Sequence, residues 1–201
     1  GGLSGSVRVA CYATAAPAVL PPILSGISES FPDMSFSILE GSIDRVLEYL
    51  DKGEADLGFS YSMQTEPRHS FLPLFDAPPF AIVPRKDPLA QKAVVTLAEL
   101  AERPLIKLDL PGARDYFADL FSNVGLTPRI AHSTRSSEIL RALVGIGFGV
   151  SLLNIRPLGY HQTDSDYAIV PIKDAISKPT FGLLTIKGLE QPRLVKAFIE
   201  S

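Results

Sequence analysis

The chain has 201 residues, of which 46% are hydrophobic and 20% charged, and its formal net charge at pH 7 is −3. This composition is typical of a globular protein that can form one or two small domains. The acidic balance lacks the clustered Lys and Arg of a nucleic-acid-binding face, so we expect any DNA contact of the parent protein to lie outside this chain. No apolar run approaches the ~20 residues of a transmembrane helix. The single cysteine, Cys11, excludes an intrachain disulfide or a cysteine metal cluster and is expected in the core.

The first 60 residues alternate between strand and helix patterns at short intervals. Val7, Val9 and Cys11 alternate with other residue types, as in a strand, and Pro17 suits the first turn of the helix that follows. Ser42 is placed to cap a second helix. We therefore expect strands at 7–11, 34–39 and 55–60, and helices at 17–31 and 43–53. Connection rules make this βαβαβ series a parallel sheet covered by helices.

The pattern breaks at residues 61–70, which are expected to form a surface loop, and Pro78–Pro79 indicates a crossing into a second unit. The alternation then restarts. Thr96 and Glu99 have capping-box spacing, and three glycines at 145–149 indicate a tight turn from helix to strand. The expected strands are 80–83, 105–108, 129–132 and 150–153, and the expected helices are 96–101, 116–121 and 137–144.

The last part of the chain is expected to return to the first unit. Strands are predicted at 168–171 and 181–186, a helix at 192–199, and the return crossing near Lys178–Pro179. The predicted fold class is α/β, with two lobes joined by two crossovers. Lobe I comprises residues 1–77 and 181–201, and lobe II comprises residues 78–180.

The sequence has few signs of catalytic chemistry. The histidines, at positions 69, 132 and 161, have no carboxylate or cysteine at metal-ligand spacing, so we expect no metal. No nucleophile elbow or phosphate loop is present, and the glycines at 145–149 follow a helix, which is the reverse of the dinucleotide-binding order. The sequence therefore favours a protein that is not an enzyme and has no cofactor.

Hydroxyl side chains recur where predicted strands end. Such groups, together with the free N–H groups of a following helix, suit a small polar or anionic ligand. The hydroxyls are Thr14, Ser42, Ser60, Ser133 and Thr134, and the arginines Arg114 and Arg135 lie in the equivalent loops of lobe II. An arginine there can hold a carboxylate bidentately. The alternative remains open that the hydroxyls only cap helices and that the arginines are solvated surface charges.

A family resemblance connects these features. In order, the segments Val7-Arg-Val-Ala, Leu20-Pro-Pro-Ile-Leu, Glu40-Gly-Ser, Leu50-Asp-Lys-Gly-Glu-Ala-Asp-Leu-Gly and Ile139-Leu-Arg-Ala-Leu-Val-Gly-Ile-Gly-Phe-Gly-Val-Ser-Leu-Leu resemble the effector-binding domain of LysR-type transcriptional regulators. The resemblance covers essentially the whole chain. It implies two Rossmann-like lobes of the periplasmic-binding-protein type II, with a small-molecule effector held between them.

The resemblance also implies site residues and partners. The family's ligand contacts fall on Ala13, Thr14 and Ser42 in lobe I, and in lobe II on Pro111, Gly112, Arg114, Ser133, Thr134 and Arg135. It implies a cytoplasmic regulator that forms a homodimer through this domain, is a tetramer at full length, has no membrane contact, and binds DNA through a winged helix-turn-helix preceding Gly1.

Two departures from the family pattern matter. Asn154 stands where the family often has proline, so the second crossing is expected to differ, and a single cysteine excludes the cysteine-pair mechanism of the peroxide sensors. Two alternatives share the clamp architecture: a solute-binding protein of a transport system, and an enzyme such as a dehydratase or deaminase. A winged helix or a signal peptide upstream of this segment would distinguish a regulator from a transport protein.

Overall fold

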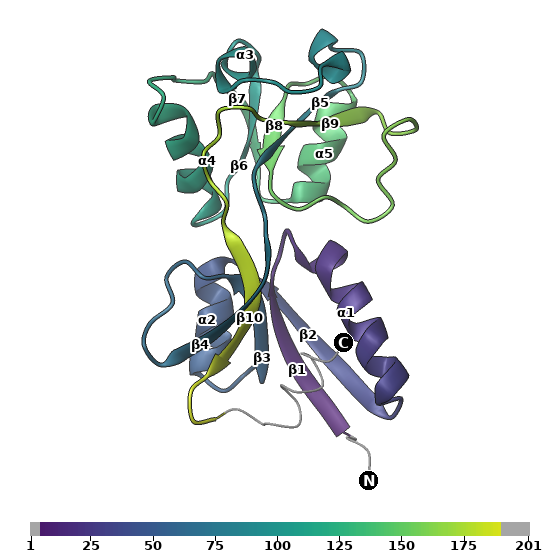
Figure 1. Cartoon of the computed structure of the whole chain (residues 1–201), viewed down its shortest axis with the longest axis vertical. Coiled ribbons are helices and arrows are strands. Elements are labelled where there is room, and N and C mark those ends of the chain that lie inside the picture. The colour runs from purple at the N-terminus through teal and green to yellow at the C-terminus, as the bar shows by residue number, and fades with distance from the viewer. Residues whose placement is uncertain (1–4, 190–201) are drawn as a thin grey trace. The chain divides into compact units, whose positions relative to one another are not determined.

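The computed structural model describes residues 5–189, so the helix predicted at 192–199 lies outside the described residues (Figure 1). The chain divides into two compact units. Unit 1 runs through Asp76 and resumes at Pro179, and unit 2 is the continuous stretch Ala77–Lys178.

Within residues 5–189, unit 1 comprises a five-stranded sheet and two helices. Its strand order is β2-β1-β3-β10-β4, with β1, β2 and β3 parallel and β10 antiparallel to both β3 and β4. The elements are β1 (Gly5–Tyr12), α1 (Ala16–Ser30), β2 (Met34–Gly41), α2 (Ile43–Asp51), β3 (Leu57–Tyr61), β4 (His69–Asp76) and β10 (Thr180–Ile186). The predicted βαβαβ order and its parallel sheet are confirmed.

The α2 helix packs closely on the sheet of unit 1. Val46 and Leu50 are buried against Ala10 and Leu184. Gly58 in β3 allows this approach, because a Cβ there would lie 3.0 Å from Leu50 Cδ1 and 3.1 Å from Val46 Cγ1. The absence of a side chain at one position of the central strand therefore sets how close the helix can lie.

The expected surface loop at 61–70 is shorter than predicted, because β4 begins at His69. His69 is buried, and its ring contacts Asp51 at the end of α2, with 2.8 Å between Nε2 and Oδ1. The rest of β4 is largely exposed and includes Pro73, as suits an edge strand. The strand forms because β10 supplies its partner from more than 100 residues away, which no local pattern shows.

Unit 2 contains a three-stranded sheet, a two-stranded sheet and three α-helices. The strand orders are β8-β5-β9, antiparallel, and β6-β7, parallel, and an isolated bridge joins Leu105 to Val150. The elements are β5 (Phe80–Pro84), the 3-10 helix η1 (Pro88–Gln91), α3 (Leu97–Ala101), β6 (Leu105–Leu108), α4 (Ala113–Ser122), β7 (Ile130–Thr134), α5 (Ser137–Gly145), β8 (Ser151–Leu153) and β9 (Tyr167–Pro171). All strands and α-helices predicted here are confirmed; η1 was not predicted.

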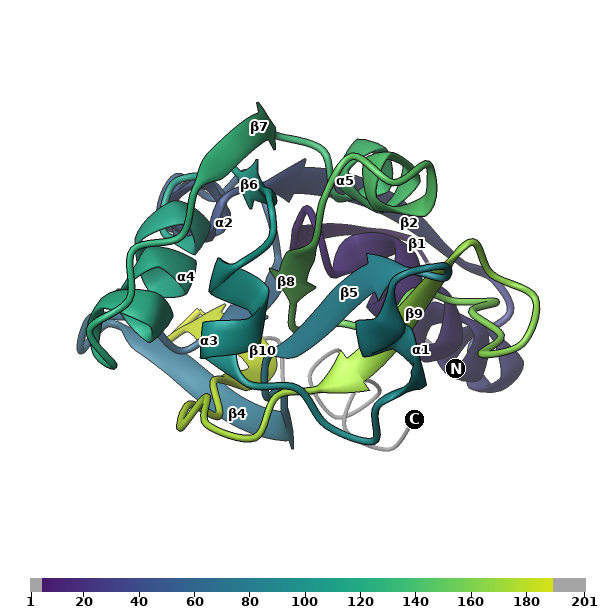
Figure 2. The ribbon, with the colours of Figure 1, turned by 90° about the horizontal axis from the view of Figure 1, so that it is seen from above.

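Side chains of β6 divide between two apolar clusters. Leu105 packs with Phe121 of α4 in one cluster, whereas Ile106 packs with Leu140 of α5 in the other. Accordingly, α4 and α5 lie on opposite sides of β6 (Figure 2). Alternation along one short strand thus positions a helix on each face.

Turn and cap chemistry agrees with the sequence. Thr96 and Glu99 form the predicted capping box, and Ser42 and Ser136 cap α2 and α5. Gly149 ends the turn after α5, where a Cβ would lie 2.4 Å from the Pro104 carbonyl oxygen. These positions admit few other residues.

Asn154 stands at the end of β8 and joins three parts of unit 2. Its Nδ2 donates to the carbonyl oxygen of Ala77 at 2.7 Å and to Tyr116 Oη at 3.2 Å. Ala77 is the first residue after the crossing from unit 1. The departure from proline at position 154 therefore gives the first crossing a side-chain hydrogen bond that proline cannot make, whereas a difference at the second crossing stays a prediction.

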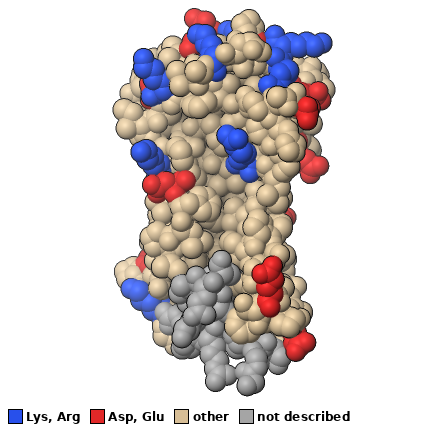
Figure 3. All heavy atoms as spheres, turned by 45° about the vertical axis from the view of Figure 1, so that its right-hand side comes forward, with Lys and Arg blue, Asp and Glu red and all other residues tan. Residues whose placement is uncertain are grey.

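Charge is distributed unevenly between the units. Unit 2 contains 12 Lys and Arg against 10 Asp and Glu, whereas unit 1 contains 7 against 12. Most of the basic side chains visible in Figure 3 lie over unit 2, at the top of the view. Among the described helices, none combines the length and apolar character that crossing a bilayer requires.

Candidate functional site

The carboxyl edge of the unit 1 sheet brings three predicted contacts together. Tyr12, the last residue of β1, pairs with Gly41, the last residue of β2. Just beyond, the backbone N–H of Ala13 donates to the Gly41 carbonyl oxygen at 2.9 Å. The turn holding Ala13 and Thr14 therefore lies beside Ser42. We call these three residues the unit 1 edge.

Ser42 combines a structural role with a free donor. Its Oγ accepts from the backbone N–H of Arg45 at 3.3 Å, which caps α2. A hydroxyl that accepts through a lone pair keeps its proton for a second partner. The cap and a ligand contact are therefore compatible, so the two interpretations of Ser42 do not exclude each other.

The start of α1 has no side-chain cap. Ala15 occupies the N-cap position without a side-chain hydrogen bond, and Pro17 lies in the first turn. The positive end of the helix dipole is therefore left without an acidic or hydroxyl cap, beside Thr14. Burial raises the pKa of the Tyr12 phenol, and its hydrogen bond with the Thr14 side chain opposes this shift.

Ser60 lies deeper than the other predicted contacts. It is in β3 with no exposed surface, and its Oγ has no hydrogen-bond partner among the described residues. An unpaired hydroxyl in such a place costs free energy. Cys11 in the neighbouring strand β1 is also buried, and burial raises the pKa of its thiol well above the usual value, which leaves it a packing residue.

The carboxyl edge of β6 and β7 repeats this arrangement in unit 2. Leu108 and Thr134, the last residues of the two strands, are paired, and the backbone N–H of Asp109 donates to the Thr134 carbonyl oxygen at 2.8 Å. Gly112 has φ +85°, a left-handed conformation that suits glycine, and α4 begins directly after it. The structure thereby groups six predicted residues, which we call the unit 2 edge: Pro111, Gly112, Arg114, Ser133, Thr134 and Arg135.

The unit 2 edge carries charge that the unit 1 edge lacks. Arg114 forms an ion pair with Asp109, with 3.2 Å between Nε and Oδ1, and both side chains are about 40% exposed. Arg135 and Ser133 are exposed. Thr134 uses its hydroxyl oxygen to accept from the backbone N–H of Ser136 at 3.1 Å, so this hydroxyl, like that of Ser42, stabilises a turn and keeps a donor.

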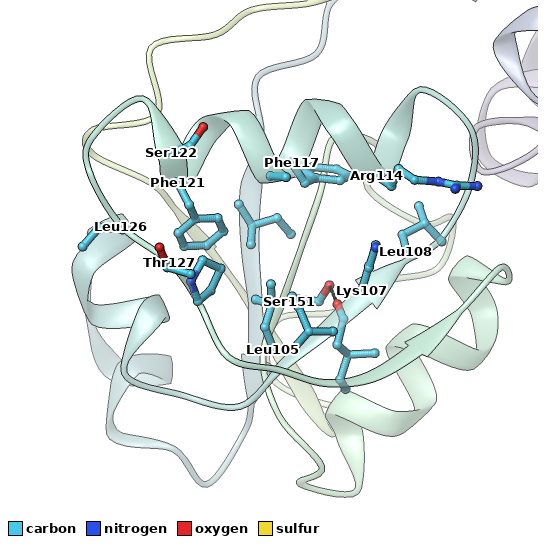
Figure 4. Close-up of a pocket in the computed structure, with 15 residues that line it drawn as sticks. Leu105, Lys107, Leu108, Arg114, Phe117, Phe121, Ser122, Leu126, Thr127 and Ser151 are labelled. Atoms are coloured by element: carbon cyan, nitrogen blue, oxygen red, sulfur yellow. Dashed lines mark hydrogen bonds between the residues drawn. The ribbon is translucent and has the colours of Figure 1, made fainter.

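A cavity that sequence reasoning missed lies within unit 2. It has a volume of about 280 Å³, is bounded by α4, β6 and the segment leading into β7, and is mainly apolar (Figure 4). We call it the α4 pocket. Of the ten predicted contacts only Arg114 lines it. Lys107 was the available signal, because a charged residue interrupts the apolar run Leu105–Leu108.

Within the described residues, no three His, Cys, Asp or Glu side chains are grouped in a way that suits a metal ion. The unit 1 and unit 2 edges offer hydroxyls, backbone N–H groups and guanidinium groups instead. These are donors for an anion and are poor ligands for a cation. The arrangement suits ligand binding.

Comparison with known proteins agrees with the two-unit α/β architecture, which is that of periplasmic-binding-protein type II folds. The structure matches HinK, a LysR family transcriptional regulator from Pseudomonas aeruginosa, with a TM-score of 0.88 and 30% identity, over 98% of this chain and 70% of that one. It also matches the effector-binding domain of QuiR in complex with shikimate, with a TM-score of 0.83 over 98% of this chain and 95% of that one. At 21% identity, QuiR supports the fold alone.

The family follows from the sequence match. The model described as LysR substrate binding domain matches residues 1–201, and the chain belongs to this family. It is 30% identical over 200 residues to the transcriptional regulator Cbl of Klebsiella aerogenes. This alignment covers 98% of this chain and 63% of the relative. The chain thus spans less than two thirds of that relative's length. The resemblance to LysR-type regulators is confirmed and is favoured over the transport alternative.

Proposed function

We propose that this chain is the effector-sensing part of a LysR-type transcriptional regulator and that it recognises a small organic anion through the unit 1 and unit 2 edges. One observation carries the proposal. At the unit 1 edge, the Ala13–Gly41 hydrogen bond places Thr14 and Ser42 together at the uncapped start of a 15-residue helix. A helix N-terminus beside hydroxyl donors is a favourable environment for an anion.

The unit 2 edge supports an acidic effector. Arg114 and Arg135 provide guanidinium groups that match a carboxylate in geometry. QuiR, whose effector-binding domain has this fold, is known in complex with shikimate, a small carboxylate. We propose a ligand of the same chemical class here. We propose that Ser60 contributes to effector binding only indirectly, because its hydroxyl is buried and not exposed to solvent.

Signal transmission follows from differential affinity. An effector shifts the domain between states only by the difference between its affinities for them. We propose that this shift passes through a homodimer of the domain, within a full-length tetramer, to a DNA-binding segment outside this chain, and that the protein works in the cytoplasm without catalysis. Apolar side chains on unit 2 offer a dimer surface: Ile130, Ile139, Ile146 and Phe148, between 48% and 66% exposed.

Calorimetric titration of the domain with a panel of small carboxylates, shikimate and benzoate included, tests the proposal. We expect at least one carboxylate to bind, and the double variant T14V/S42G to weaken that binding about tenfold. Glycine is the chosen replacement at position 42 because it keeps most of the N-cap stability. The matched control is T163V, an exposed threonine of unit 2, which should bind normally.

Two results would contradict the proposal. One is equal affinity of T14V/S42G and the parent chain, which would remove the unit 1 edge from the site. The other is the absence of binding by every carboxylate while neutral or cationic compounds bind.

The proposed dimer has its own test. I146E should shift the domain from dimer to monomer in sedimentation, and a monomeric parent chain would refute the dimer.

A further inference from the structure

The α4 pocket has a long apolar wall. Phe117 and Phe121 project from α4 and face Leu105 of β6 across the cavity, and Leu126 closes the end near Ser122 (Figure 4). An apolar cavity of ~150 Å³ is enough to bind benzene. At about 280 Å³, this pocket has room for a ring or a medium-length chain together with a head group.

Two of the three hydroxyls that line the pocket are already paired within the protein, and the third, that of the exposed Thr127, lies at the Leu126 end (Figure 4). Ser151 Oγ donates to the Ile106 carbonyl oxygen at 2.6 Å, and Ser122 Oγ donates to the Asp119 carbonyl oxygen at 3.3 Å. Neither hydroxyl proton is left for a ligand. The body of any occupant therefore meets carbon atoms along most of its length.

The other end of the pocket is cationic. Lys107 occupies the strand position that alternation assigns to the α4 side, as Leu105 does two residues earlier. In Figure 4, Lys107 and Arg114 lie at the same end, near the start of α4. Lys107 lines the pocket, so its ammonium group is placed to contact a ligand there.

One carboxylate serves both cations. Asp109 is 3.2 Å from Arg114 Nε, but Lys107 Nζ lies 3.9 Å from Asp109 Oδ1, beyond hydrogen-bond distance. Two positive groups facing one negative group leave a net positive charge at this end. Lys107 is 38% exposed, so the ammonium can reach an incoming anion.

We propose that the α4 pocket is a second ligand site, which binds a small amphiphilic carboxylate. The apolar body lies between α4 and β6, and the carboxylate is held by Lys107 with Arg114 beside it. This site lies entirely within unit 2 and does not depend on the proposed effector site, although Arg114 belongs to both. The test therefore uses residues that only the α4 pocket contains.

Titration calorimetry with octanoate tests the proposal, with octan-1-ol as the neutral probe. We expect octanoate to bind the parent chain at least tenfold more tightly than octan-1-ol. K107M should weaken octanoate about tenfold and leave octan-1-ol unchanged, and K107R should restore octanoate binding. A118F, which places a ring in the cavity, should abolish binding of both probes. K86M, at an exposed lysine outside the pocket, is the matched control.

The experiment distinguishes a failure of the second-site proposal from a failure of the effector-site proposal. If T14V/S42G abolishes octanoate binding while A118F and K107M leave it intact, octanoate occupies the effector site and the second site is refuted. Octanoate binding that all these variants leave unchanged also refutes it. Loss of binding in A118F counts only if its circular dichroism and melting temperature match those of the parent chain; if A118F is unfolded, K107M alone decides.

Discussion

The unit 1 and unit 2 edges have the same backbone arrangement but carry different side chains. In each, two parallel strands end in register, and a backbone N–H beyond one strand donates to a carbonyl oxygen at the end of the other. The unit 1 edge then carries hydroxyls and an uncapped helix start, whereas the unit 2 edge adds Arg114 and Arg135. We propose that the shared backbone positions the ligand contacts in both units and that charge selectivity belongs to unit 2.

The largest expected effect comes from removing one core ring in each unit. Phe59 in β3 and Phe121 in α4 are both 1% exposed. F59A and F121A should each cost about 3–5 kcal/mol of unfolding free energy. Hydrogen exchange should show the loss of protection mainly in the unit that carries the substitution. Equal loss of protection in both units would mean that the two units unfold together and do not have separate stabilities.

Acid sensitivity has the same physical cause in both units. The hydrogen bond from Arg68 lowers the pKa of the Asp51 carboxyl, burial raises it, and the contact with His69 lowers it further. Together they lower this pKa from 3.8 to about 2. Because the folded-state pKa lies below the unfolded value, the contribution is complete above about pH 5 and is lost as the pH falls toward 2. Arg103 lowers the pKa of Asp87 in unit 2 in the same sense.

Substitution of these carboxylates measures the acid sensitivity of each unit. D51N should remove up to about 2 kcal/mol at pH 7 and flatten the acid limb of the stability curve, because Asn cannot titrate. D87N should act in the same direction. Urea unfolding from pH 7 to pH 3 measures both, with the exposed Asp33 and its variant D33N as control. An acid limb as steep in D51N as in the parent chain would show that other groups dominate.

Charge selectivity predicts an asymmetric response to salt. R114M and R135M should each weaken a carboxylate effector about tenfold, or about 1.4 kcal/mol, and should reduce the dependence of affinity on ionic strength. T14V should weaken the same effector without changing the salt dependence. Calorimetry at low and high NaCl measures the two effects. The assignment of charge recognition to unit 2 fails if T14V changes the salt slope as much as R114M does.

The smallest effect distinguishes capping from binding. Ser42 and Ser136 cap helices in equivalent ways, accepting at 3.3 and 3.2 Å from backbone N–H groups. S42A and S136A should each cost about 1 kcal/mol of stability. Only S42A should also weaken the effector, because Ser136 is not among the proposed contacts. Thermal melts with and without effector measure this, and equal ligand effects in both variants would reduce Ser42 to a cap.

Most of the fold could be predicted because its signals are local. The Thr96–Glu99 capping box, the Ser42 cap and the alternation of Val7 and Val9 each depend on a few neighbouring residues. The start of β4 could not be predicted, because His69 is polar and its burial depends on Asp51, which is 18 residues away in sequence. Local chemistry thus defines elements, whereas remote partners decide which polar residues are buried.

Candidate site residues divide in the same way. Thr14, Ser42 and Thr134 were predicted from their place after strands, and the structure locates them at two sheet edges; their contact with a ligand stays a prediction. The α4 pocket was missed because its walls come from α4, β6, β8 and the segment before β7. Only the packing of these segments creates a cavity. Lys107 alone indicated it, as one charge within an apolar strand.

The position of β10 has a consequence for how this protein is made. β10 lies between β3 and β4, and it is the strand with which β4 pairs in the described sheet. A ribosome releases β3 and β4 first and then all of Ala77–Lys178 before β10 emerges. Until then, two strand edges of the nascent chain are open to wrong partners. The continuous unit can mature first, and the interrupted one must wait for its last strand.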